Sequence, residues 1–457
     1  MLNAKSKKKR CIVVGGGVAG IAAAVDATML GFDVVLVEGR RYLGGRARSF
    51  RDEITGDEID NGQHVAMGCY NALRYVLRQL GTEQLLRPDE PIPIAFASAN
   101  GMCDVFDPYR LPGVMGVIAG VLRLQSFSRA ERLHLLWGGV RAALGRSEAH
   151  ETVAALLERY GQPNAAIERF WEPLVLATLN APSDAADASL LRVVLRRAFF
   201  GGGSSHHLLV PRVGLSELWK PLPSWLAERG GEIRLGTYAV ELIESGGRII
   251  GVATDDGKEI RGNVVIAAVP SKALQRLLPH HLVTTPEFEM MPIVSAYLWY
   301  DRCVSVPPVV GLWGTTSQWL FNRGSFIPRS GESQRDFPGH VEITISGARQ
   351  LALQPSDDIA ALVDEELRAV FPSLAGIRLL RWRVLKERTA TVLLTPKTNR
   401  MRLGTESGIA GVLVAGDWTA TGLPATLESA ALSGITAART AARLLETAPP
   451  THEKSLW

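Results

Sequence analysis

Three glycines near the N-terminus have the spacing of a phosphate-binding turn. Gly15, Gly17 and Gly20 form a Gly-x-Gly-x-x-Gly pattern, and an acidic residue, Glu38, ends the next apolar run. Glycine lets the backbone approach a pyrophosphate, a helix that begins here offers free N–H groups, and the carboxylate can accept hydrogen bonds from ribose hydroxyls. The pattern predicts a dinucleotide site whose phosphate contacts come from Gly15, Gly17, Val18, Ala19 and Gly20.

Two further glycine motifs favour FAD over NAD as the dinucleotide. Gly44-Gly45-Arg46 combines close backbone approach with a cation for phosphate or flavin oxygens. Near the C-terminus, Gly416-Asp417 follows an apolar run and precedes a helical stretch, so a carboxylate and a positive helix end can face the ribityl chain and the flavin ring. The predicted cofactor contacts from these motifs and from the β-rich stretch 231–269 are Gly44, Gly45, Arg46, Val240, Gly416, Asp417 and Thr426.

These motifs need strands and helices that bring them to one edge of a sheet. Residues 10–14 and 33–38 are short apolar runs typical of buried parallel strands, and residues 18–30 between them predict a helix that ends at a glycine. Together they predict a βαβ unit. Residues 411–415 predict another buried strand, which leads through the Gly-Asp motif to a helix over 425–445.

The remaining segments predict a β-meander and a second domain. Residues 231–269 hold short β-type runs separated by turn signals, residues 91–205 are helical in periodicity, and residues 271–404 are mixed. We therefore predict an α/β fold: a Rossmann-type FAD-binding domain with an inserted β-meander and a second, mixed α+β substrate domain. The predicted FAD-binding domain takes residues 10–90, 206–270 and 405–446, the substrate-binding domain takes 91–205 and 271–404, and the flexible tails are 1–9 and 447–457.

Composition limits the class of protein further. Hydrophobic residues make up 46% and charged residues 21%, which suits a folded chain with more than one core. The net charge is only +4 and much of it lies in a basic run over residues 5–10, which we interpret as a solvated tail, so nucleic acid is not a predicted partner. Four scattered cysteines without CxxC spacing argue against a metal site or a disulfide framework and favour a reducing, cytoplasmic setting.

The combined motifs resemble the amine oxidase and carotenoid desaturase superfamily. Further stretches resemble one branch of it, the squalene-associated FAD-dependent desaturases now understood as hydroxysqualene dehydroxylases, and they cover nearly the whole chain. These stretches are DNGQH at 60–64, FWEPL at 170–174 with LN at 179–180, LVPRVGLS at 209–216, KER at 386–388 and TGLPAT at 421–426. The chain departs from the family pattern at Arg197, where an acidic residue is expected, and at His206-His207, where a Ser-Asp pair is expected.

The resemblance implies a long-chain isoprenoid alcohol as substrate and squalene as product, on the way to hopanoids or related triterpenes. In hydroxysqualene the alcohol carbon lies beside a double bond, so protonation and loss of water would leave an allylic cation that can accept a hydride from reduced flavin. Such a site needs an apolar tunnel and an acid whose pKa is raised by burial. The candidate catalytic residues are Asp60, His64, Glu172 and Glu428.

Three other functions stay open at this level. A plant-type carotenoid desaturase shares the Gly-Asp turn and the helix after it, although TGLPAT at 421–426 favours the dehydroxylase. An amine oxidase would need an aromatic cage beside the flavin. A non-catalytic prenyl-lipid carrier would have no need of Glu38, Arg46 and Asp417. Because one dinucleotide fingerprint is visible, we expect electrons from a diffusible reductant or a partner protein, and the sequence identifies neither.

A lipid substrate implies a second partner, a membrane surface on the inner face of the cytoplasmic membrane. Residues 111–122 are apolar yet too short to span a bilayer. Residues 190–200 pair apolar side chains with Arg192 and Arg196, which are four positions apart and so share a helical face, as in an interfacial helix. We therefore predict that the second domain docks on a membrane through these two stretches.

Overall fold

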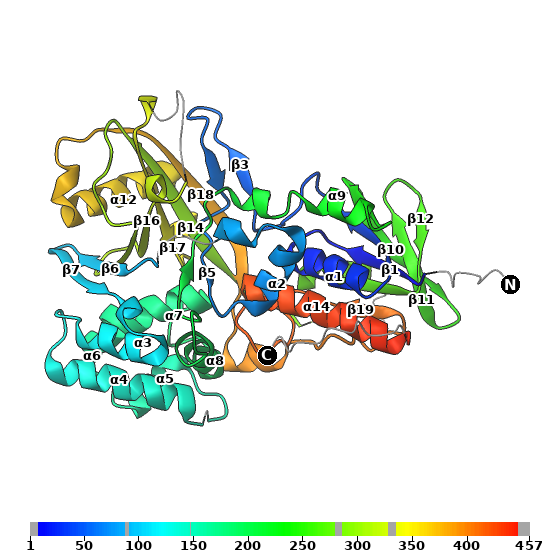
Figure 1. The fold of residues 1–457 in the computed structure, drawn as a ribbon, viewed down its shortest axis with the longest axis horizontal. Coiled ribbons are helices and arrows are strands. Elements are labelled where there is room, and N and C mark those ends of the chain that lie inside the picture. Colours follow the sequence, from blue (N-terminus) through cyan, green and yellow to red (C-terminus); the bar gives the residue numbers. More distant parts are fainter. Residues whose placement is uncertain (1–7, 87–90, 147, 279–285, 328–334, 447–457) are drawn as a thin grey trace.

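The computed structural model describes residues 8–86, 91–146, 148–278, 286–327 and 335–446. One half of the molecule is built around a parallel sheet, and the other half holds a larger mixed sheet with a layer of helices beside it (Figure 1). The predicted tails, apart from residues 8 and 9, lie outside the described residues.

The parallel sheet carries the glycine motifs. Its order is β19-β13-β1-β2-β9, and every pair of neighbouring strands is parallel. Two of the strands have the bounds that their apolar runs predict, because such runs are buried on both faces of a parallel sheet. The strands are β1 Arg10–Val14, β2 Asp33–Glu38, β9 Glu232–Leu235, β13 Val264–Ala267 and β19 Val412–Val414.

Helices α1 (Val18–Met29) and α14 (Leu427–Leu444) pack against each other on one face of this sheet. Small residues allow the close approach: a Cβ on Gly434 would lie 2.1 Å from the Ala19 carbonyl oxygen. Helix α2 (Asn71–Leu80) packs on α14 and α1. The N-terminal and C-terminal segments therefore share one core.

The β-meander over 231–269 is smaller than predicted. Residues 239–261 form a three-stranded antiparallel sheet, whose apolar side chains pack on the second face of the parallel sheet. The outer runs of this stretch are instead the parallel strands β9 and β13. At Gly236 the chain turns and passes from the parallel sheet to the antiparallel one. The sequence does not show this change, because both strands lie in one continuous β-type run. The three strands are β10 Ala239–Ser245, β11 Arg248–Thr254 and β12 Glu259–Arg261.

The second half is built on a mixed sheet with the order β18-β14-β17-β16-β15-β6-β7. Helix α12 (Ser356–Val370) contributes apolar side chains to the core on one face. The prediction that residues 91–205 are helical is wrong at their start, because 94–106 form a hairpin whose first strand pairs with β15. The strands are β6 Ile94–Ser98, β7 Gly101–Phe106, β14 Met290–Tyr300, β15 Val309–Trp313, β16 Trp319–Asn322, β17 Gly339–Ile345 and β18 Leu379–Val392.

The helical layer and short elements complete the fold. A π-helical turn, Ile167–Trp171, leads into α7. Two small two-stranded sheets pair β3 with β4 and β5 with β8. The helices are α3 Gly113–Leu122, α4 Arg129–Leu144, α5 Val153–Arg159, α6 Asn164–Ala166, α7 Glu172–Leu179, α8 Ala188–Phe199, α9 Leu222–Ala227, α10 Ser271–Leu277 and α13 Pro396–Arg400. The short strands are β3 Ser49–Arg51, β4 Glu58–Asp60, β5 Ala66–Met67 and β8 Leu208–Leu209.

The interfacial-helix prediction for residues 190–200 is wrong for Arg192, whereas Arg196 is exposed on the same helix. Residues 190–199 lie in α8, but Arg192 is 2% exposed there. A Cβ on Gly145, which ends α4, would lie 3.4 Å from Arg192 Nη2. A guanidinium buried against a neighbouring helix cannot contact lipid headgroups. Within the residues that the structure describes, no helix is both long enough and apolar enough to cross a membrane.

Candidate functional site

The glycine turn lies between β1 and α1, and two of its glycines are fixed by packing. Gly15 has φ +106° and donates its N–H to the Val37 carbonyl at 2.8 Å. A Cβ there would lie 2.3 Å from the Ala268 carbonyl oxygen, and a Cβ on Gly20 would lie 1.8 Å from the Gly15 carbonyl oxygen. Both positions therefore require glycine for the fold itself.

Gly17 is different, because a Cβ on it would meet no described atom within 4 Å. It is the N-cap of α1, and no described side chain makes a capping hydrogen bond there. The first turn of α1 holds no acidic residue. This helix end thus offers free N–H groups and a positive dipole to an anion. The space in front of it stays open because Gly17 has no side chain.

Glu38 orders the glycine turn from the end of β2. Its Oε2 accepts from the Gly16 N–H at 2.6 Å, and its Oε1 accepts from the Arg40 N–H at 2.7 Å. The side chain is thus held beside the turn where a nucleotide ribose is predicted to lie. Its role toward a ribose stays a prediction.

Arg46 connects the second glycine motif to the C-terminal one. Its Nη2 lies 2.7 Å from Asp417 Oδ1, and its Nη1 donates to the Ala390 carbonyl. The charge of Asp417 raises the pKa of Arg46. Gly44 and Gly45 both have positive φ, and Gly44 forms a bridge with Gly17. The three predicted motifs therefore lie together at the carboxyl ends of the parallel strands.

The loop at 416–424 is held by a residue that sequence reasoning missed, Arg402. Its guanidinium donates to three carbonyl oxygens at 2.7–3.2 Å, those of Asp417, Trp418 and Leu423. Burial lowers the pKa of Arg402 to about 10. From the other side, Ser433 of α14 accepts from the Gly416 N–H at 2.8 Å. No sequence motif indicates the role of Arg402, because the loop that it holds follows the next strand, β19.

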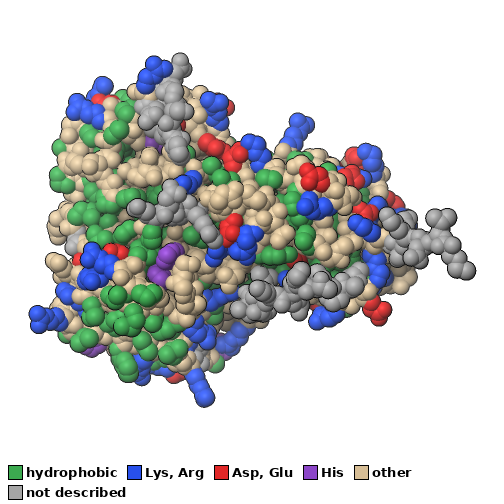
Figure 2. Space-filling view, in the orientation of Figure 1, with side chains coloured by type: hydrophobic (Ala, Val, Ile, Leu, Met, Phe, Trp, Pro, Cys, Tyr) green, Lys and Arg blue, Asp and Glu red, His purple; other side chains and the backbone are tan. Residues whose placement is uncertain are grey.

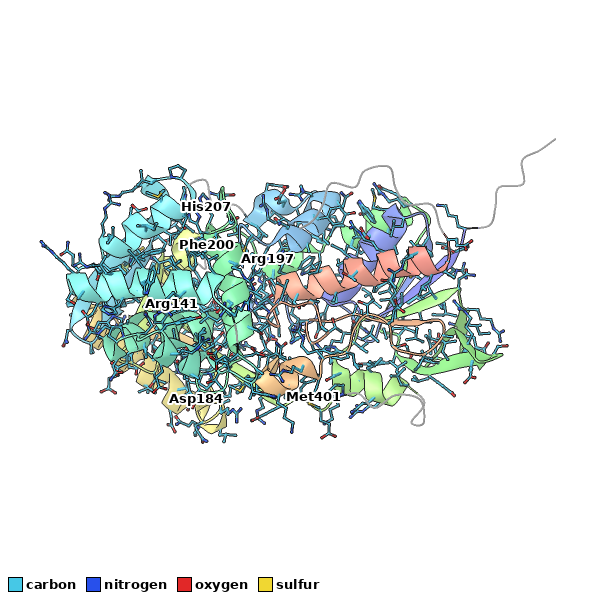
Figure 3. The ribbon with its side chains drawn as sticks, turned by 90° about the horizontal axis from the view of Figure 1, so that it is seen from below. Arg141, Asp184, Arg197, Phe200, His207 and Met401 are labelled. Atoms are coloured by element: carbon cyan, nitrogen blue, oxygen red, sulfur yellow. The ribbon has the colours of Figure 1, made fainter. Side chains whose placement is uncertain are left out.

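A cavity opens beside this loop, between the segment that joins β5 to α2, the helices α7 and α8, and the start of α14. Its walls are mainly apolar, with one ion pair: Arg197 Nη1 lies 3.8 Å from Glu428 Oε1. Figure 3 shows Arg197 on α8 near the N-terminal end of α14. The lining residues are Met67, Cys69, Tyr70, Thr178, Val193, Val194, Arg197, Ala198, Leu423, Pro424, Thr426 and Glu428.

Among the four candidate acids, Glu428 lines this cavity. Its two oxygens accept from the Ala72 and Leu73 N–H groups at 3.1 and 3.0 Å, so it also caps the start of α2. Burial raises its pKa, although those hydrogen bonds and Arg197 oppose the shift. A carboxyl group with a raised pKa beside an apolar cavity is suited to donate a proton.

Asp60 belongs instead to a buried ionic cluster with Arg323 and Glu342. Arg323 Nη1 lies 2.9 Å from Asp60 Oδ2 and 3.2 Å from Glu342 Oε2, and all three side chains are at most 2% exposed. Burial raises the pKa of Glu342 to about 7, against the opposing effect of Arg323. The Gln63 N–H donates to Glu342, so the cluster fixes the 60–64 loop.

The remaining predicted residues lie apart from the cavity lining. His64 Nδ1 shares a hydrogen bond with the Gly62 carbonyl at 2.7 Å, and burial lowers the pKa of His64. Glu172 accepts from the Ser183 N–H and so closes the loop after α7. Val240 is 51% exposed on β10. Nothing in these contacts assigns them to catalysis or to cofactor binding, and their roles stay predictions.

Comparison with known proteins places this site in a family. The family model described as "Flavin containing amine oxidoreductase" matches residues 18–442. The chain belongs to the flavin-containing amine oxidoreductase family. Members of this family are flavoproteins, so the protein is a flavin-dependent oxidoreductase.

Relatives within the flavin-containing amine oxidoreductase family agree with the branch that the motifs resemble. A hydroxysqualene dehydroxylase of Sinorhizobium fredii is 31% identical, over 94% of this chain and 97% of the relative. One from Rhodopseudomonas palustris is 30% identical, over 93% and 96%. A 15-cis-phytoene desaturase of Glycine max is more distant, with 23% identity over 94% of this chain and 78% of that protein. The resemblance to the hydroxysqualene dehydroxylases is confirmed, and the desaturase alternative is not favoured.

Solved structures of amine oxidases share the fold. Cyclohexylamine oxidase from Brevibacterium oxydans superimposes with a TM-score of 0.66 at 15% identity, covering 96% of this chain and 100% of that one. Putrescine oxidase bound to putrescine gives 0.69 at 15% identity, covering 96% and 99%. The predicted fold class is thereby confirmed.

Proposed function

We propose that the protein is an FAD-dependent hydroxysqualene dehydroxylase that reductively removes the hydroxyl group of hydroxysqualene to give squalene, for hopanoid or related triterpene synthesis. The similarity to hydroxysqualene dehydroxylases over nearly the full length of both chains carries this proposal. The electron donor in this proposal is a diffusible reductant or a partner protein, and the setting is the cytoplasm at the inner face of the membrane.

The residues of the glycine turn fit FAD. The open N-terminus of α1 at Gly17 would receive the pyrophosphate, and Glu38 would accept from the adenosine ribose. Asp417, tied to Arg46, would face the ribityl chain. The N-terminus of α14, at Thr426, would stabilise negative charge on the reduced ring. A flavin without an adenosine half would leave Glu38 without a partner ribose.

The proposed reaction is balanced by one proton and one hydride. The carbon–oxygen bond of the alcohol breaks, the hydroxyl group leaves as water after protonation, and the carbon gains the hydride that reduced flavin supplies. The chain must bring the proton to the alcohol oxygen and exclude bulk water. The apolar walls of the cavity suit the second task, and Glu428 is the carboxyl group in position for the first.

We expect Glu428→Gln to lower the kcat of the reduced enzyme by about 100-fold or more, the usual contribution of a general acid. Glutamine cannot donate this proton. It keeps one of the two oxygens that accept at the start of α2, so flavin absorbance should stay close to wild type while Tm falls modestly. Because the pKa of Glu428 is raised, wild-type kcat should stay constant at pH values somewhat above the ordinary carboxyl pKa. It should fall once pH exceeds the raised pKa of Glu428.

Glu172→Gln is the matched control, because Glu172 is bonded to the Ser183 N–H away from the cavity lining. It should keep kcat within about threefold of wild type. If Glu428→Gln lowers Tm but leaves kcat and its pH profile unchanged, Glu428 is a helix cap and the proton donor lies elsewhere.

The reaction itself is tested with photoreduced enzyme under anaerobic conditions in deuterated buffer. Hydroxysqualene dispersed in detergent should give squalene with one deuterium at the former alcohol carbon, and oxidised enzyme should give none. Phytoene and a primary amine are offered in parallel to the oxidised enzyme. Desaturation of phytoene or oxidation of the amine, without any squalene from the reduced enzyme, would contradict the proposal and identify the alternative.

A further inference from the structure

Exposed apolar side chains gather on the outer surface of α3 and α4. Among the described residues, eight of the eighteen exposed large hydrophobic side chains lie between residues 102 and 144. Figure 2 shows hydrophobic side chains concentrated over these helices, with basic side chains at the margin. We call this the α3–α4 face and define it by Leu111, Met115, Leu122, Leu133, Trp137 and Leu144.

The face follows from the periodicity of the two helices. Helix α3 contains no charged residue, and Met115 and Leu122, seven positions apart, lie on its exposed side. On α4, Leu133 and Trp137 are 61% and 60% exposed and four positions apart. The opposite side of α4 is buried at Leu135 and Gly138. Both helices thus turn apolar residues toward solvent, where a soluble surface would carry polar ones.

The segment that carries this face is rich in arginine. Residues 107–146 contain six arginines and two acidic residues. Of the acidic pair, Asp107 bonds Arg110 at 2.8 Å, and Glu131 closes the capping box of α4 with Ser128. Arg141, labelled in Figure 3, lies 5.9 Å from the ring of Trp137. The rim therefore presents positive charge around an apolar centre.

We propose that the α3–α4 face docks the protein on an anionic phospholipid bilayer. Apolar side chains, tryptophan among them, enter the interface between headgroups and acyl chains, while the arginines contact lipid phosphates. A second copy is a poorer occupant, because two such faces would bring arginines against arginines. Both helices contact α8, which lines the cavity, so docking would put the cavity beside the lipid. This last step rests on the proposed function.

The test is flotation of the flavin-loaded protein with vesicles of phosphatidylcholine, with or without phosphatidylglycerol. Wild type should bind the anionic vesicles more tightly, and salt should weaken binding. Leu133→Glu with Trp137→Glu should lower the affinity by about tenfold or more, because two apolar side chains are lost from the interface. Arg123→Gln and Arg129→Gln should each lower it about fivefold.

Leu353→Glu is the matched control, since Leu353 is 74% exposed and lies outside this face. It should bind like wild type. Equal binding by all variants, or binding that ignores lipid charge, would overturn the proposal. A dimer in solution that the Leu133→Glu, Trp137→Glu variant abolishes would assign the face to a second copy instead.

Turnover of detergent-dispersed hydroxysqualene separates this proposal from the proposed function. The Leu133→Glu, Trp137→Glu variant should keep wild-type turnover in detergent and lose it with substrate in vesicles. Vesicle binding without any turnover would contradict the function alone, and turnover without vesicle binding would contradict the docking face alone.

Discussion

A Gly17→Val variant should be a folded protein without flavin. A Cβ at this position would meet no described atom within 4 Å, so we expect little effect on packing. It would, however, cover the N–H groups at the start of α1, where the pyrophosphate is proposed to lie. Loss of two or more charge-assisted hydrogen bonds, at about 1.5–3 kcal/mol each, predicts flavin affinity reduced by about 100-fold or more. Flavin absorbance and Tm of the purified protein measure the two effects.

Gly20→Ala is the contrasting variant. Its Cβ would overlap the Gly15 carbonyl oxygen at 1.8 Å, so this change should lower Tm whether or not flavin is present. Full flavin occupancy in folded Gly17→Val would remove the start of α1 as the phosphate site. Loss of flavin together with a Tm as low as that of Gly20→Ala would point to a packing role for Gly17.

Arg323→Met should strongly destabilise the fold. Methionine fills a similar volume, but Asp60 and Glu342 would be left as buried carboxylates without their cation. Breaking a buried ion pair in this way costs about 3–5 kcal/mol in the free energy of unfolding. Arg261→Met is the control, because the Arg261–Glu259 pair at 2.8 Å is exposed and should contribute under about 1 kcal/mol.

The stability that Arg323→Met loses should depend on pH, and the pKa of Glu342 determines the direction of this dependence. Its folded-state pKa is raised to about 7, so its contribution to stability is present below the ordinary carboxyl range and is lost as pH rises through about 7. Without Arg323, which opposes the rise, the pKa should be higher still. Urea unfolding should therefore show a smaller deficit near pH 5.5 than near pH 8. Equal deficits at both pH values would mean that Glu342 does not titrate in this range.

The glycine motifs and their strands could be predicted because their signals are local. Strands β1 and β2 have the predicted bounds, and α14 begins two residues after its predicted start. Each is a continuous apolar or helical run with a glycine turn at one end, and neighbours in sequence fix its conformation. The α/β fold class follows from such runs.

The mixed sheet and the buried clusters could not be predicted in the same way. Strand β6 pairs with β15, more than 200 positions later in the chain, and β7 pairs with β6. Nothing within these two short runs distinguishes them from a helix. Arg323 and Asp60 are separated by 263 positions, and a single arginine in a sequence carries no sign of its burial. For the same reason, Arg192 had an interfacial spacing but lies in the interior.

The link between Arg46 and Asp417 spans 371 positions of the chain. During synthesis, the N-terminal βαβ unit leaves the ribosome long before β19 and α14 are made. Until then it lacks strand β19, helix α14 and Asp417, the carboxylate partner of Arg46. A flavin site that uses Asp417 can therefore be complete only after nearly the whole chain has been synthesised. A nascent chain stalled before residue 417 would expose the apolar face of α1 that α14 covers, and at that stage it would depend on chaperones for its solubility.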